Sequence, residues 1–168
     1  MKKWLGFAML AGILAACQES ENISEFTGNE TIYALQQASQ YAISGTVTLK
    51  ERKDGKTTLV VQLIGTEGTS NYPVHLHRGD LSTPQADVAA LLNPLVGKTG
   101  KSETLLDKLA DETAVTYKDL INLKACLKIH LSDVGVERTI ILAGGNIGAS
   151  ITAYNPGGRL GIAVCKSE

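Results

Sequence analysis

Apolar residues recur at every second position over much of the chain, and this period of two constrains the fold more than any other feature. In the stretch ISGTVTLK, residues 43–50, apolar residues alternate with polar ones, which is typical of a strand with one buried face. Asp54 and Gly55 follow as a pair suited to the positive φ angles of a tight hairpin turn. The stretch TTLVVQLIG, residues 57–65, then predicts the return strand of an antiparallel hairpin.

Four further segments also read as strands. Residues 69–79, 123–132, 138–145 and 159–165 are short and rich in apolar residues, with turn-forming residues between them. Pro73 is confined to the start or to the edge of its strand because it cannot donate a ladder hydrogen bond. Several short strands separated by turns predict an all-β antiparallel fold, a β-sandwich or flattened barrel, rather than a parallel sheet.

The middle of the chain has a weaker pattern. Residues 82–94 fit either a short helix, with Thr83 as N-cap, or a loop that leads into a strand at ADVAALL. Residues 103–112 fit one or two helical turns, and residues 116–123 fit another short helix with Thr116 as N-cap. The expectation is therefore a β domain with short helical turns in its loops.

The N-terminus resembles a bacterial lipoprotein signal. Two lysines precede an apolar run, and the sequence LAAC ends at Cys17, like the site cut by lipoprotein signal peptidase. This pattern predicts a signal peptide at residues 1–16, acylation of Cys17 and a polar tether at residues 17–30. The remaining residues, 31–168, are enough for one domain. Because Gln18 rather than aspartate follows the cysteine, we expect anchoring to the outer membrane, facing the periplasm or the cell surface.

Charge and motifs exclude several classes of function. The formal net charge is −1, and no basic block is present, which argues against a nucleic-acid partner. We find no serine nucleophile with a base, no phosphate-binding loop and no carboxylate pair with a recognisable spacing. The partners left by this reasoning are the membrane, through the lipid, and a small ligand or ion.

The three histidines are the strongest candidates for such a ligand site. Alternate residues of a strand face opposite sides, so His75 and His77 share one side of their strand. The same alternation places His130 on the outer side of residues 123–132, opposite the core. Two imidazoles in an H-x-H pair can reach one metal ion, and a third ligand makes the site firm. The alternative is that all three are surface histidines with no shared role.

Two aspartates flank the histidine motifs. Asp80 and Asp133 could orient an imidazole from behind. Aspartate beside glycine or serine is more often a turn residue, and we favour that interpretation for both.

Cys126 and Cys165 form an even pair once Cys17 is lipidated, and the envelope is oxidising. If residues 123–132 and 159–165 pair antiparallel, Cys126 opposes Cys165, and a disulfide is predicted. That register also brings Arg159 near His130. The alternatives are two free thiols and a solvated arginine.

Three short patches resemble the copper/zinc superoxide dismutase family and, more closely, the CHRD domain. They are HLHRG at residues 75–79, KIH at residues 128–130 and NPGGRLG at residues 155–161. The similarity covers roughly residues 31–165 and implies a Greek-key fold. It also implies that His75, His77 and His130 are copper ligands and that Arg159 steers an anion toward the metal.

The sequence also departs from the dismutases. It has three histidines, so the bridging histidine and the zinc subsite of the dismutases have no counterpart. Residues 132–154 form a long insertion before the last strand. The expected function is a copper-binding envelope lipoprotein, with a metal-free CHRD-type module and a true dismutase as alternatives. Because an imidazole must lose its proton to bind a metal, we expect binding to weaken below about pH 6.5.

Overall fold

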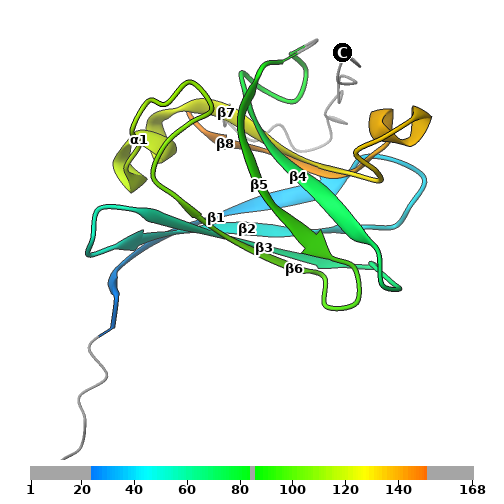
Figure 1. The fold of residues 1–168 in the computed structure, drawn as a ribbon, viewed down its shortest axis with the longest axis horizontal. Helices are drawn as coiled ribbons and strands as arrows, with labels where there is room; N and C mark the ends of the chain where they lie inside the picture. The colour runs from blue at the N-terminus through cyan, green and yellow to red at the C-terminus, as the bar shows by residue number, and fades with distance from the viewer. Residues whose placement is uncertain (1–23, 84–85, 151–168) are drawn as a thin grey trace, which may run out of the picture.

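The computed structural model describes residues 24–83 and 86–150, which form a closed barrel of antiparallel strands (Figure 1). The elements are β1 (Phe26–Gln37), β2 (Ser44–Arg52), β3 (Thr57–Ile64), β4 (Asn71–Arg78), β5 (Val88–Val96), β6 (Lys101–Leu106), α1 (Tyr117–Asn122), β7 (Lys124–His130), the 3-10 turn η1 (Val136–Thr139) and β8 (Ile141–Gly148). Around the barrel the strand order is β1-β2-β3-β6-β5-β4-β7-β8. The prediction of an all-β antiparallel fold is confirmed, and the sheet closes into a barrel.

The strand order contains a Greek key that brings the histidine strands together. Strands β4, β5 and β6 follow one another in the chain and in the barrel, and β7 then returns to lie beside β4. The connection that allows this return runs through α1. As a result, the strand that carries His75 and His77 pairs directly with the strand that ends at His130.

Alternation predicted the first hairpin correctly. Strands β2 and β3 pair in register from Ser44 with Ile64 to Glu51 with Thr57. Gly55 has φ 84° and closes the turn by donating its N–H to the carbonyl of Arg52 at 3.1 Å. The apolar faces of these and the other strands point into the barrel and form one core, which includes Val47, Leu49, Leu59, Val61, Val74, Leu76, Leu95, Leu127, Ile129 and Leu142.

The helical prediction for residues 103–112 is wrong at its start, because β6 occupies Lys101–Leu106. Its inward residues include Ser102 and Thr104, whose hydroxyls bond the backbone of Asn93 at 2.6 and 2.9 Å. Buried hydroxyls that are satisfied in this way hide the apolar alternation that marks a strand. Leu105, in contrast, points outward.

The other two uncertain segments are now assigned. Residues 82–94 follow the strand alternative, with β5 beginning at Val88. The short helix predicted near residue 116 is confirmed as α1. Thr116 accepts a hydrogen bond from the N–H of Asp119, whose carboxylate accepts one from the N–H of Thr116, so both halves of a capping box are present.

The domain begins earlier than the sequence predicted. Strand β1 starts at Phe26 and pairs with β2, so the last residues of the predicted tether belong to the barrel. The insertion predicted at residues 132–154 contains η1 and all of β8, which closes the barrel between β7 and β1. Cys17, Arg159 and Cys165 lie outside the described residues. None of the helices in the described ranges is long and apolar enough to cross a membrane.

Candidate metal centre

His75, His77 and His130 lie together on the outside of the barrel wall. Their ring centroids are 4.7 Å apart for His75 and His130, 5.8 Å for His75 and His77, and 6.3 Å for His77 and His130. Each ring offers one nitrogen such that all three nitrogens lie within 4.8 Å of one another. The predicted convergence of these histidines is therefore confirmed, and the group could hold a metal ion.

The pairing of β4 with β7 explains this convergence. His75 pairs with Lys128 and His77 pairs with Cys126, so these side chains share a face. The intervening residues Leu76 and Leu127 point into the core on the other face. His130 lies two residues beyond Lys128 and thus joins the same face at the end of β7.

The outer side of the strands, where the sequence places these histidines, is largely buried. His77 and His130 are each only 1% exposed, and Cys126 and Lys128 are not exposed at all. The loop after β4 covers this face, because the N–H of Leu81 donates to Oδ1 of Asn146 at 2.8 Å. Leu81 also lies 3.0 Å from the position that a Cβ on Gly144 would take, so the end of its side chain packs closely against Gly144. The alternation of side chains along the strands predicted the correct side of the sheet for the histidines. It did not predict that this side is buried.

Two of the histidines lie at irregularities in the strand pairing. The register between β4 and β5 shifts between Leu76 and His77, and the register between β7 and β8 shifts between Ile129 and His130. Such bulges twist a strand locally and redirect a side chain. In both places the extra residue lies on the partner strand, Ala89 in β5 and Leu142 in β8.

Backbone carbonyls fix the same two imidazoles. Nδ1 of His77 lies 2.9 Å from the carbonyl oxygen of Ala86, and Nδ1 of His130 lies 2.9 Å from that of Arg138. A carbonyl only accepts, so in the neutral ring each Nδ1 carries the proton and the lone pair is on Nε2, the tautomer that many metal-ligating histidines adopt. The N–H of Arg78 donates to the carbonyl of Asp87 at 2.9 Å and anchors the segment that holds Ala86.

Sequence reasoning did not identify these carbonyl partners, because any residue supplies a carbonyl. Of the two aspartates considered for that role, Asp80 accepts from the N–H and the hydroxyl of Ser82, which confirms its interpretation as a turn residue. Asp133 is exposed, and its negative charge tends to raise the pKa of His75.

His75 forms the open side of the cluster. It is half-buried, and its ring has no hydrogen bond to another residue of the described ranges. Either of its nitrogens is therefore available to an incoming ion. His75 is the most exposed of the three histidines.

The environment keeps the three imidazoles neutral near pH 7. Burial lowers the pKa of His75 and of His77 to about 4, and burial also lowers the pKa of His130. The neighbouring imidazoles and the cations Lys128 and Arg138 act in the same direction. The loss of binding expected near pH 6.5 therefore moves to lower pH, since His75 and His77 gain a proton only toward pH 4 and the pKa of His130 is lowered as well.

The donor set fits a borderline metal ion. Three neutral imidazole nitrogens suit copper or zinc, and three protein ligands leave a coordination position open for water or a small ligand. No carboxylate or thiolate in the described ranges joins the group. The geometry does not select one of these metals.

The disulfide proposed between Cys126 and Cys165 needs a different geometry from the one expected. Both edges of β7 are occupied, by β4 and by β8, so no other strand can pair with β7 and place residue 165 directly opposite Cys126. Cys126 itself is buried on the histidine face. The disulfide stays a prediction, because Cys165 lies outside the described residues.

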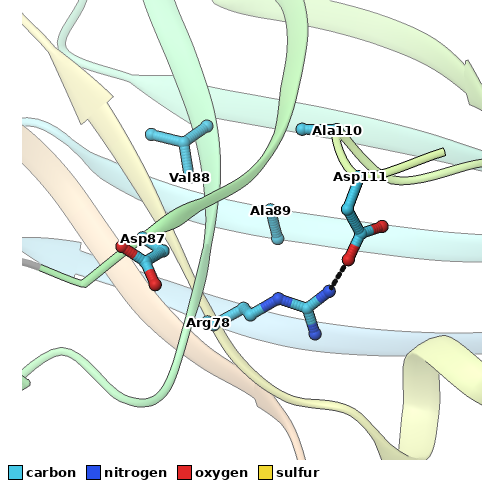
Figure 2. Close-up of a pocket in the computed structure, with 6 residues that line it drawn as sticks. All are labelled: Arg78, Asp87, Val88, Ala89, Ala110 and Asp111. Carbon is cyan, nitrogen blue, oxygen red and sulfur yellow. Dashed lines mark hydrogen bonds and ion pairs between the residues drawn. The ribbon is translucent and has the colours of Figure 1, made fainter. Parts of the chain in front are cut away.

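A separate hollow of about 360 Å³ lies near the loop after β4 (Figure 2). Its walls are formed by Arg78, Asp87, Val88, Ala89, Ala110 and Asp111. Figure 2 shows the guanidinium of Arg78 directed at the carboxylate of Asp111, with which it pairs at 2.7 Å. Solvent screens an exposed pair of this kind, so it contributes little to stability. With its cation already paired and no histidine in its wall, this hollow is a weaker candidate site than the histidine cluster.

Comparisons with known proteins leave the site to be judged on its geometry. No family model, no curated protein and no solved structure matches this chain. The resemblance to the CHRD and dismutase families therefore rests on the three short patches alone.

Proposed function

We propose that this protein is a lipoprotein of the bacterial cell envelope that binds one copper ion through His75, His77 and His130. The observation that carries the proposal is the convergence of three nitrogen donors within 4.8 Å of one another. Copper is favoured over zinc because it stands highest in the affinity order of divalent ions for nitrogen ligands.

The way in which the histidine rings are held supports metal binding rather than the alternative of three surface histidines with no shared role. Two of the rings are buried and held at Nδ1 by backbone carbonyls. Metal-ligating histidines commonly have this second hydrogen bond, which fixes the tautomer.

The envelope location rests on the N-terminal pattern. Residues 1–16 fit a signal peptide, and acylation of Cys17 would attach the barrel to the outer membrane. In that compartment a copper-binding barrel could store the ion or use its open coordination position. Superoxide dismutation is a narrower proposal, which depends on the steering role that the resemblance gives to Arg159.

Titration of the untagged domain with copper tests the proposed function. We expect one ion per chain in the wild type and at least about a tenfold loss of affinity in His75→Ala, His77→Ala and His130→Ala, since each removes one of three ligands. Lys124→Ala, on the same strand as His130, serves as the control and should bind like the wild type. Absence of stoichiometric copper in the wild type would favour a metal-free module instead.

A further inference from the structure

The turn η1 contributes nothing to the core of the barrel. None of its residues is buried, and Val134 and Val136 are 69% and 85% exposed. Strands β7 and β8 are already joined before this turn, because the N–H of Leu131 donates to the carbonyl of Ile140 at 2.9 Å. A hairpin connection from there needs only about two to five residues, whereas this one runs through residues 132–139. Packing and strand pairing therefore do not explain the length of this connection.

The turn does provide a carbonyl group at the metal cluster. The backbone carbonyl of Arg138 accepts the hydrogen bond from Nδ1 of His130 at 2.9 Å. Carbonyls in the last residues of a helical turn have no partner further along that turn, so they are available to side chains. The connection thus returns toward the end of β7 and fixes the tautomer of the histidine that lies there.

Local interactions hold the backbone of this connection in shape. Gly135 precedes η1 with φ 64°, a conformation that residues with a side chain rarely adopt. The hydroxyl of Thr139 donates to the carbonyl of Val136 at 2.8 Å and closes the turn. Before the turn, the N–H of Val134 donates to Oγ of Ser132 at 3.2 Å. Each of these interactions acts on the backbone, so the sequence specifies the shape of the turn although none of its side chains is buried.

We infer that η1 is a positioning element of the metal site, in which Gly135 and Thr139 hold the carbonyl of Arg138 against Nδ1 of His130. The inference rests on the proposed metal site and identifies the residues that prepare one of its three ligands. Gly135 and Thr139 do not bind the ion themselves and act only through the backbone of Arg138. Loss of the hydrogen bond to His130 would allow the proton to move to Nε2, where it competes with the ion.

The substitutions Gly135→Ala and Thr139→Val test this role. A Cβ added at residue 135 meets no atom within 4 Å, so the alanine brings backbone strain without a clash. Valine removes the hydroxyl of Thr139 and keeps its branched shape. Nitrogen NMR of the metal-free protein at neutral pH shows which imidazole nitrogens carry a proton, and His130→Gln identifies the signals of His130 by their loss. We expect Nδ1–H in the wild type and a substantial Nε2–H population in both variants.

Copper affinity is the second measurement. Competition with a chromogenic copper chelator should show a loss of about tenfold in each variant, because an outer hydrogen bond to a ligating histidine is typically worth at least that factor. Thr139→Ser restores the hydroxyl. In that variant both the tautomer of His130 and the copper affinity should return to the wild-type values.

Gly55→Ala is the matched control. Gly55 also has a positive φ, 84°, and no atom lies within 4 Å of an added Cβ. It lies in the turn between β2 and β3, which do not pair with β4 or β7. The strain should destabilise this variant about as much as Gly135→Ala. Its His130 tautomer and its copper affinity should stay unchanged, which separates positioning from a general loss of stability.

The outcomes separate this inference from the proposed function. A wild type that binds no copper would overturn the metal site, and the imidazole tautomers would still show whether η1 holds His130. A wild type that binds copper, together with folded Gly135→Ala and Thr139→Val proteins that bind it equally well, would overturn only the role of the turn. An unchanged His130 tautomer in both variants would overturn that role as well.

Discussion

His77 and His130 each donate Nδ1–H to a backbone carbonyl at 2.9 Å, so their orientations are set by the fold before an ion arrives. His75 lacks such a bond to the described residues and stands at the open side of the cluster. His77 and His130 would hold an ion with fixed orientations, and His75 would supply the third nitrogen. Metal binding by these residues requires neutral imidazoles. Burial favours the neutral form because it lowers the pKa of all three histidines.

The lowered pKa values predict how the stability of the metal-free protein depends on pH. In the unfolded chain the imidazoles titrate near 6.5, whereas in the folded protein His75 and His77 titrate at about 4. Between these values the unfolded chain binds more protons, so the free energy of unfolding should fall as the pH drops from 6.5 toward 4 and stay level above pH 7. Because solvent screens the half-buried His75, the loss should be on the order of a few kcal/mol.

Chemical denaturation of the metal-free protein at several pH values measures this loss. The triple variant His75→Gln, His77→Gln, His130→Gln is the control, since it retains every carboxylate that also titrates at low pH. We expect the wild type to lose more stability than the triple variant over this window. Equal pH dependence in the two proteins would mean that the histidines are not held neutral by the fold.

The elements around the site were predictable to different degrees. The two-residue period identified β2, β3, β4 and β7, and the capping residues identified α1, because these signals are local. The same period placed all three histidines on one side of the wall. It could not show that a loop covers that side, because the cover depends on contacts such as the one between Leu81 and Asn146, which are 65 residues apart. The bulges and the carbonyl partners likewise follow from tertiary pairing and have no signature in residue type.

The covering loop yields a prediction at the scale of elements. Asn146→Ala removes the acceptor of the buried Leu81 N–H, and an unsatisfied buried donor costs about 1–3 kcal/mol. We expect a loss of stability of that size and faster hydrogen exchange at the amide of Leu81. Asn29→Ala, at an exposed asparagine that bonds the carboxylate of Glu51, should change the stability by less than about 0.5 kcal/mol. If the two variants are equally stable, the loop is not held by this bond.

For the whole molecule, closure of the barrel and the Greek key have one functional result. The return of β7 to the side of β4 brings His130 next to His75 and His77, more than fifty positions away in the sequence. Strand β8 then pairs with the other edge of β7 and closes the barrel. Strand order of this kind cannot be read from local periodicity. The Greek key entered the sequence-based prediction only through the resemblance.

The proposed attachment to the membrane is a property of the whole chain and has its own test. Cys17→Ser removes the thiol that would carry the lipid, so we expect the protein to move from the membrane fraction to the soluble fraction of the expressing bacteria. Gln18→Ser, at the neighbouring position, should leave the protein in the membrane fraction. Membrane association that survives Cys17→Ser would contradict the lipoprotein proposal.

The central claim is that one copper ion lies between His75, His77 and His130. Crystals of the copper-loaded domain, with diffraction collected on both sides of the copper absorption edge, test it most directly. We expect a single anomalous peak about 2.0–2.1 Å from one nitrogen of each ring, with Nε2 as the donor of His77 and His130. A map without a peak among the three rings, or with copper bound only elsewhere on the barrel, would contradict the claim.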